Sequence, residues 1–217
     1  MKGGNRRRPG MRVFVALDPP HEVRAEVEAW GRQLARSRSG LRVVPARNSH
    51  VTLAFLGNRD EYEVDQILGA ISETVSPVRG LALGAPAWLP RKRPRNLVLD
   101  LHDDRRELME MQSDLARALG HAVGWKEDRP YRPHLTCART GRGFDPTRLL
   151  LQVSPSISFS ADSVTLYRSR LQPEGAEYEA IERFPLGPSG PFGESTRFEL
   201  PADAAVPPDQ VRRARAQ

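Results

Sequence analysis

Residues His50–Gly57 read HVTLAFLG, and residues His134–Arg139 read HLTCAR. Both segments begin with the pattern His-x-Thr, and their histidines lie 84 positions apart. In an extended strand, residues two apart share a face, so each segment presents a histidine and a threonine together. Strict alternation places the small residues Ala54 and Ala138 beside these polar pairs, where they leave room for a ligand. It sends Phe55 to the opposite, apolar face.

The spacing of 84 positions extends beyond the two motifs. Under the same shift, the apolar run Val13–Leu17 falls on Leu97–Leu101. Amphipathic helical segments also fall on one another. The correspondence predicts that residues 12–90 and 96–174 are two copies of one strand–helix–strand–helix–strand unit, joined as two lobes around a shared cleft.

Apolar residues at helical spacing predict three long helices. Their apolar positions are Val23, Val27, Trp30 and Leu34 in the first helix, Val64, Ile67, Leu68, Ile71 and Val75 in the second, and Leu108, Met111, Leu115 and Leu119 in the third. We expect Asp60 to open the second helix and Asp103-Asp104 to cap the third. Gly57-Asn58 is expected to stop the first motif strand, and Asp145-Pro146 to open a short fourth helix.

Composition indicates the cellular compartment and the extent of the folded domain. The 217 residues include one cysteine, which rules out an internal disulfide and favours a reducing compartment. We find neither an apolar run of the roughly 20 residues that span a bilayer nor a signal-type segment, so we expect a cytoplasmic protein. Much of the +6 net charge lies in the terminal segments. Residues 1–10 are expected to form a disordered basic arm, residues 11–187 one two-lobed domain, and residues 188–217 a mostly disordered tail.

The paired motifs have the groups that phosphodiester cleavage requires. Two imidazoles can divide proton removal and proton donation between them, because histidine titrates near neutral pH. The hydroxyls of Thr52 and Thr136 can donate to phosphate oxygens. In-line attack needs the acid and the base on opposite sides of phosphorus, which two related lobes would provide. Symmetry alone does not say which of His50 and His134 gives the proton.

With these motifs and their flanking residues, the chain resembles the two-histidine (2H) phosphoesterase superfamily. Within it, the chain is most similar to the RNA 2′,3′-cyclic phosphodiesterases, also known as 2′-5′ RNA ligases. The matching segments are Val13–Asp18, His50–Gly57, Arg132–Arg139 and Val164–Leu171, followed by Tyr178 and Phe184–Leu186. They run in family order from residue 12 to about 186, so only the termini lie outside.

The resemblance implies an α+β, bilobal fold with a pseudo-two-fold duplication, in which antiparallel sheets line a central cleft and helices lie outside. It implies metal-free, cofactor-free hydrolysis of RNA 2′,3′-cyclic phosphate ends to 2′-phosphomonoesters. In this family assignment His50 is the proton donor and His134 the base, and both motif threonines hold phosphate oxygens.

Three further residues are candidates for substrate binding. By the resemblance, Arg139 lies near the phosphate and Phe14 contacts the nucleoside. Because strict alternation sets Arg139 opposite His134, this role requires the strand to end or bulge after Ala138. Tyr131 either stacks on a base or is a core residue.

Other interpretations of the sequence remain open. The chemistry also suits 2′-5′ linkages, in hydrolysis or reversible ligation, and small cyclic nucleotides. A non-catalytic module that binds RNA ends is a further alternative. A zinc site lacks ligand spacings such as His-x-x-x-His or Cys-x-x-Cys, so we expect no metal. Nothing requires more than a monomer.

Basic residues suggest where RNA would bind. The set Arg129, Arg132, Arg139 and Arg142 surrounds the second motif and is the better candidate patch. The loop Pro90–Arg95 is either a second RNA contact or only a solvated turn.

Overall fold

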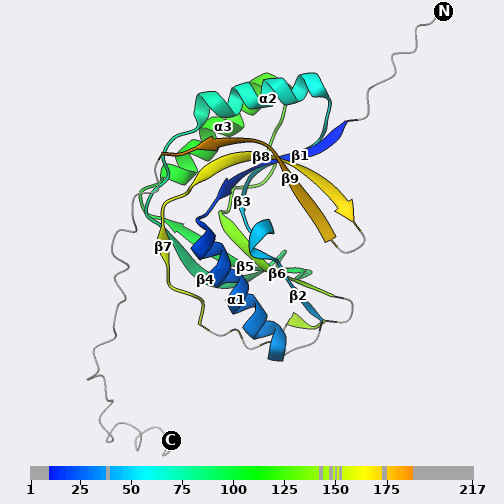
Figure 1. Ribbon diagram of the computed structural model, residues 1–217, viewed down its shortest axis with the longest axis vertical. Helices are drawn as coiled ribbons and strands as arrows, with labels where there is room; N and C mark the ends of the chain where they lie inside the picture. The colour runs from blue at the N-terminus through cyan, green and yellow to red at the C-terminus, as the bar shows by residue number, and fades with distance from the viewer. Residues whose placement is uncertain are drawn as a thin grey trace, which may run out of the picture.

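The protein consists of two antiparallel sheets and three long helices. The computed structural model describes residues 10–37, 40–141, 144–146, 149, 151, 153–172 and 175–187 (Figure 1). The predicted tail at 188–217 and residues 1–9 of the predicted arm lie outside the described residues.

One sheet has four strands in the order β3-β1-β8-β9, and the other has five in the order β2-β6-β5-β4-β7. Every paired neighbour is antiparallel. The first sheet contains β1 (Met11–Asp18), β3 (Val51–Arg59), β8 (Ser163–Gln172) and β9 (Gly175–Pro185). The second contains β2 (Leu41–Val43), β4 (Leu81–Leu89), β5 (Asn96–Asp103), β6 (His134–Thr140) and β7 (Ser158–Phe159).

The predicted helices are confirmed. They are α1 (His21–Ser37), α2 (Glu61–Thr74) and α3 (Glu107–Val123), with a short turn of 3₁₀ helix, η1 (Ala46–Asn48), before the first motif. The apolar positions on each helix pack against the sheets, because a helix with one apolar stripe is stable only when that stripe is covered. Helix α1 contacts β2 and β6, whereas α2 packs on α3 at the outside of the first sheet (Figure 1).

The two sheets are topologically alike. A shift of 84 residues carries β1 to β5, β3 to β6 and β4 to β8, so the order β3-β1-β8 corresponds to β6-β5-β4. The α+β fold with two related antiparallel sheets is therefore as predicted. Each sheet takes its third strand from the other half of the chain, which ties the halves together. This correspondence favours our proposal of a duplication at 12–90 and 96–174.

One local prediction was wrong, one is met in part, and one lies mostly outside the described residues. The first motif strand does not stop at Gly57-Asn58, because Gly57 adopts a φ of 74° that glycine tolerates, and β3 continues to Arg59. The predicted cap of the third helix is met in part: Arg106 occupies the N-cap position of α3, but the Asp103 carboxylate accepts a hydrogen bond from the backbone amide of Met109 in the first turn. Much of the predicted helix after Asp145 lies outside the described residues.

Asp60 opens α2 as predicted, and it does so through a reciprocal capping box with Glu63. The Asp60 carboxylate accepts from the Glu63 amide at 2.9 Å, and the Glu63 carboxylate accepts from the Asp60 amide at 3.1 Å. Removing an N-cap carboxylate leaves a helix amide without a partner.

We therefore expect Asp60→Ala to lower the free energy of unfolding by about 1 kcal/mol in urea denaturation. Asp65→Ala removes the same charge from an exposed position on α2, and we expect it to change stability by less than about 0.5 kcal/mol. Equal effects of the two substitutions would show that the capping box is not the cause.

Candidate active site

The first motif strand carries a β-bulge that alternation did not predict. In the pairing of β1 with β3, Ala16 lies opposite Thr52 and Val15 opposite Ala54, so Leu53 is an extra residue. Beyond the bulge the side chains exchange faces. Ala54 is buried in the core, whereas Phe55 is 46% exposed and lines the cavity beside His50. The predicted places of Ala54 and Phe55 were therefore reversed.

The second motif strand has the corresponding bulge. Val98 lies opposite Thr136 and Leu97 opposite Ala138, so Cys137 is the extra residue. Ala138 consequently enters the core instead of flanking a ligand, and Arg139 emerges on the face of Thr136. The geometry that the role of Arg139 requires is present, but the bulge lies one residue earlier than expected.

These strands bring residues of both motifs to one cavity of about 230 Å³. His50, Thr52 and Phe14 line it from the first sheet, and Thr136 and Arg139 line it from the second. His134 is not among the lining residues. It lies two residues before Thr136 on the same strand, and its charge is close enough to lower the pKa of His50. Five of the seven predicted site residues thus line the cavity.

The two histidines are anchored in the same way. Nδ1 of His50 lies 2.9 Å from the carbonyl oxygen of Asn48, and Nδ1 of His134 lies 2.7 Å from the carbonyl oxygen of Arg132. Because a carbonyl only accepts, each Nδ1 carries a hydrogen. Each neutral ring therefore has Nε2 as its unprotonated nitrogen, available for proton transfer.

The two anchoring residues are themselves held in place. Arg132 makes a bidentate ion pair with Asp100 on β5, with nitrogen–oxygen distances of 2.9 and 2.7 Å. The side-chain Nδ2 of Asn48 donates to the carbonyl oxygen of Ala176 on β9 at 3.2 Å. Such second interactions fix the orientation of both imidazoles before a ligand arrives.

Aromatic rings surround His50. The ring centroid of Phe14 lies 4.9 Å from that of His50, and the centroid of Tyr178 lies 5.2 Å from it in an edge-on arrangement. Tyr178 also lines the cavity, as does Phe55, over whose ring the Arg12 guanidinium lies at 4.7 Å. Our site prediction missed these cavity residues. For Phe55 the cause is the bulge, which reverses the side expected from alternation.

The buried carboxylate of Asp18 lies near His50. Asp18 accepts hydrogen bonds from the hydroxyls of Ser163, Thr165 and Tyr167, at 3.0, 2.5 and 2.9 Å. These three donors compensate for the burial of the Asp18 side chain, since Asp18 is only 5% exposed. Tyr167 in turn stacks on Phe14 at 5.3 Å, which links the carboxylate to the floor of the cavity.

The electrostatic balance keeps His50 neutral. Burial is the largest effect and lowers the pKa of His50 to about 4, although the negative charge of Asp18 and the carbonyl of Asn48 raise it in part. The positive charges of Arg139 and His134 lower the pKa further. At neutral pH His50 is therefore an uncharged imidazole in the free protein.

Tyr131 does not reach the cavity. Its ring packs against the core, and its buried hydroxyl has no hydrogen-bond partner among the described residues. Burial and the charge of Asp103 raise the pKa of this hydroxyl far above its usual range. The predicted base-stacking role of Tyr131 is therefore not supported, and its other predicted interpretation, a core residue, fits.

The predicted basic patch divides among different environments. Arg129 is exposed, Arg132 is committed to Asp100, Arg139 lines the cavity, and Arg142 lies outside the described residues. The loop Pro90–Arg95 lies at neither the 230 Å³ cavity nor a larger adjoining one.

The described part of the chain contains neither a metal-binding cluster nor a membrane-spanning helix. No cluster of three or more His, Cys, Asp or Glu side chains there could hold a metal ion. No helix there is long and apolar enough to cross a membrane.

Two linked antiparallel sheets whose His-x-Thr strands meet at one cavity are the features of a two-histidine phosphoesterase. Residues 19–173 match the family model described as the 2′-5′ RNA ligase superfamily. The chain belongs to this superfamily, which confirms the resemblance found in its motifs.

Curated relatives extend the similarity over most of the chain. An RNA 2′,3′-cyclic phosphodiesterase of Thermus thermophilus is 30% identical over 186 residues, which cover 81% of this chain and 90% of the relative. Relatives with the same name from Escherichia coli and Methanocaldococcus jannaschii are 28% and 26% identical, covering 81% and 80% of this chain and 96% and 100% of theirs.

Solved structures share the fold. A protein of Thermus thermophilus superimposes with a TM-score of 0.67 at 28% identity, covering 81% of this chain and 98% of the other. Escherichia coli LigT, solved in complex with NADP⁺, superimposes with a TM-score of 0.67 at 25% identity, covering 82% and 98%.

The burial and charged neighbours of His50 predict how its ring titrates. In NMR spectra of the free protein, the His50 ring should titrate near pH 4, and Asp18→Asn should lower that pKa further because it removes the charge that favours imidazolium. Asp65→Asn, at an exposed position on helix α2, is the matched control. An unchanged His50 pKa in Asp18→Asn would contradict the electrostatic role of Asp18.

The same pKa predicts how stability depends on pH. Because the folded pKa of about 4 lies below the ordinary value of 6.5, the unfolded chain binds more protons between these pH values. The contribution of His50 to stability should therefore rise with pH through this window and level off above it. Urea denaturation of His50→Asn should show a weaker rise than the wild type, whereas His102→Asn, at an exposed position, should not differ from it.

Proposed function

We propose that the protein hydrolyses 2′,3′-cyclic phosphate ends of RNA to 2′-phosphomonoester ends. The observation that carries the proposal is that residues of both His-x-Thr motifs meet at one cavity. Family membership and relatives named RNA 2′,3′-cyclic phosphodiesterase support the substrate class. We further propose that the enzyme acts as a monomer without a metal or cofactor, in the cytoplasm.

The reaction breaks the bond between phosphorus and the 3′ oxygen. Nε2 of His134 takes a proton from water as the water oxygen attacks phosphorus. The 3′ oxygen leaves from the opposite side and receives a proton from Nε2 of His50, which regenerates a 3′ hydroxyl. Phosphorus gains a bond to the water oxygen and keeps its bond to the 2′ oxygen, so the product is a 2′-phosphomonoester.

Thr52, Thr136 and Arg139, which line the cavity, stabilise the phosphate. The hydroxyls of Thr52 and Thr136 donate to the non-bridging oxygens, one from each sheet. Arg139 offsets the negative charge that develops on these oxygens. Phe14 provides an apolar surface for the nucleoside.

Proton donation requires His50 to gain a proton when the substrate binds. Its pKa of about 4 in the free protein reflects burial and the neighbouring positive charges. A phosphodiester anion beside the ring counters both effects and favours imidazolium, so substrate binding raises the pKa of His50. His134 must be neutral at the same time, and the rate should be bell-shaped in pH.

Replacing either histidine should cause a large loss of activity. We expect His50→Ala and His134→Ala each to lower kcat by ~10²–10⁴-fold on an oligonucleotide with a 2′,3′-cyclic phosphate end, measured in EDTA. Thr52→Val removes one hydrogen bond to a charged group and should cost roughly tenfold. His102→Ala, at an exposed position, should retain full activity. Full activity in both imidazole variants, a 3′-phosphate product or strict metal dependence would contradict the mechanism.

A substrate with a better leaving group separates the roles of the histidines. A nucleoside 2′- or 3′-(4-nitrophenyl phosphate) releases nitrophenolate, which leaves without protonation. The loss caused by His50→Ala should therefore shrink on this substrate, whereas that caused by His134→Ala should persist. The reverse pattern would exchange the acid and the base.

Action on 2′-5′ linkages is a second candidate, favoured by the family's description as 2′-5′ RNA ligases. Ligation retraces the same displacement, with a 5′ hydroxyl in place of water. Incubating RNA carrying 2′,3′-cyclic phosphate ends with RNA carrying 5′ hydroxyl ends, and analysing the linkage, tests it.

A further inference from the structure

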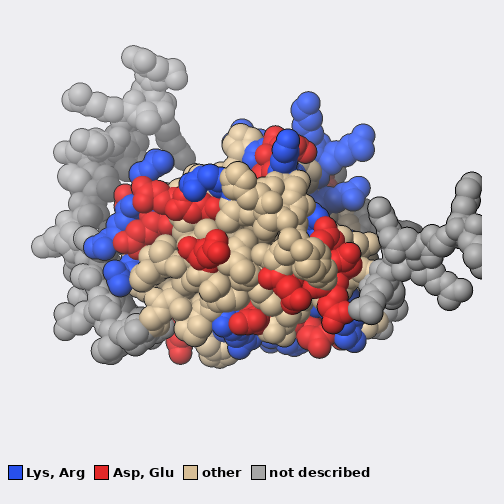
Figure 2. Space-filling view, turned by 90° about the horizontal axis from the view of Figure 1, so that it is seen from above, with Lys and Arg blue, Asp and Glu red and all other residues tan. Residues whose placement is uncertain are grey.

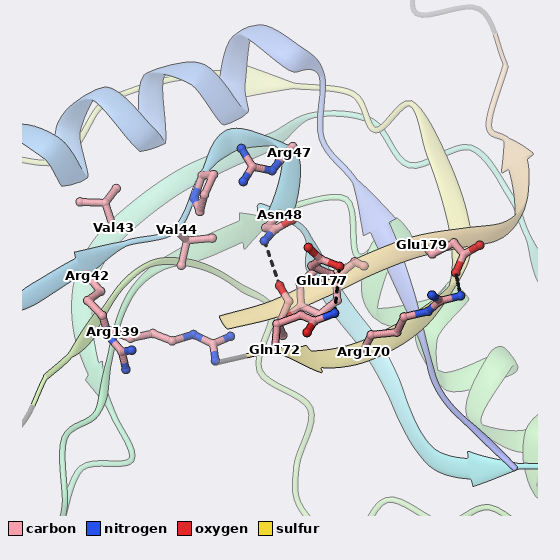
Figure 3. Close-up of a pocket in the computed structure, with 13 residues that line it drawn as sticks. Arg42, Val43, Val44, Arg47, Asn48, Arg139, Arg170, Gln172, Glu177 and Glu179 are labelled. Carbon is pink, nitrogen blue, oxygen red and sulfur yellow. Dashed lines mark hydrogen bonds and ion pairs between the residues drawn. The ribbon is translucent and has the colours of Figure 1, made fainter. Parts of the chain in front are cut away.

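A second and larger cavity adjoins the catalytic one. It encloses about 700 Å³ between β2, η1, β6 and the β8–β9 hairpin (Figure 3). Val44, Asn48, Arg139, Ala176 and Tyr178 line both cavities, so the two are continuous. We call the larger one the arginine groove, because Arg42, Arg47, Arg139 and Arg170 line it.

Three of these arginines form no ion pair within the described residues, although the charge of Arg47 is close enough to help lower the pKa of Glu28. Arg170 pairs with Glu179 at 2.9 Å, but Arg42, Arg47 and Arg139 have no carboxylate within ion-pair distance in the part of the chain that the structure describes. Figure 3 shows Arg42 and Arg139 side by side at one end of the groove. All three are exposed, so their guanidinium groups are accessible to an anion.

The position of Arg42 is unfavourable without a ligand. In the pairing of β2 with β6, Arg42 lies directly opposite Arg139. Like charges opposite one another on neighbouring strands destabilise a sheet, and an anion between them removes the repulsion. Acidic and basic groups are interspersed over the face of the molecule seen in Figure 2, so that face carries no broad positive field. The arginine groove is instead a local site for an anion.

The arginine groove is well placed to bind a second phosphate, in addition to the one in the catalytic cavity. Arg139 faces both cavities, so an anion in the groove lies next to the phosphate in the catalytic cavity. An RNA strand whose 3′ end occupies the catalytic cavity must carry its preceding phosphodiester out of that cavity. Arginine is well suited to hold such a group, because its planar fork donates two hydrogen bonds to phosphate oxygens.

We propose that Arg42 and Arg47, with Arg139 at the junction, bind the phosphodiester that joins the terminal nucleotide to the one before it. This inference rests on the proposed function. It makes the substrate an oligonucleotide rather than a nucleoside 2′,3′-cyclic phosphate, which lacks that group.

The test compares two substrates with the same terminal nucleoside: adenosine 2′,3′-cyclic monophosphate and a tetranucleotide ending in the same cyclic phosphate. The wild type should have the higher kcat/KM on the tetranucleotide. The variant with both Arg42→Gln and Arg47→Gln should lose roughly tenfold or more on the tetranucleotide and less than about twofold on the mononucleotide. Its rate should also depend less steeply on salt, since each phosphate contact contributes to that slope.

Arg117→Gln is the matched control, because Arg117 is an exposed arginine on α3 that pairs with Asp114. Its preference for the tetranucleotide should equal that of the wild type. Arg42→Gln should leave the melting temperature unchanged or higher, since it removes a repulsion. A folded double variant that keeps the wild-type preference and salt dependence would overturn the groove assignment alone. Failure of the wild type on both substrates would overturn the proposed function, and this inference with it.

Discussion

An extra residue at the same point of each motif strand, Leu53 in β3 and Cys137 in β6, is the constraint on which the site depends. Each of these bulges reverses the alternation of the side chains that follow it, in β3 as far as a second irregularity at Leu56. Without them, Phe55 and Arg139 would enter the core and two alanines would face the ligand. The bulges therefore convert a pair of ordinary half-buried strands into the walls of an anion pocket. Their matched positions give the two sheets the same local design.

The pKa of His50 at this pocket is set by burial and by the charges around it. His50 is held neutral by its surroundings, while the nearby carboxylate of Asp18 limits how far its pKa falls. Arg139 works in the opposite direction in the free protein, because its charge disfavours imidazolium. A phosphate group neutralises that charge and restores the proton affinity of His50. In the proposed mechanism, substrate binding thus prepares the acid for its task.

The sequence predicted the fold well because its signals are periodic. The helices followed from apolar spacing, and the shift of 84 residues anticipated the matching strand orders. The bulges escaped prediction because they are properties of strand pairing, and HVTLAF is compatible with plain alternation. Arg42 escaped for a similar reason. It lies on a three-residue strand, and its neighbour Arg139 is distant in the chain. Tyr131 was ambiguous because nothing in its local sequence says that its ring turns into the core.

The most direct measurement of the central claim is a crystal structure of the protein with a nucleoside 2′-phosphate bound. We expect one phosphate within hydrogen-bonding distance of Nε2 of both His50 and His134 and of the hydroxyls of Thr52 and Thr136. A phosphate that contacts only one imidazole, or that binds away from both motif strands, would contradict it.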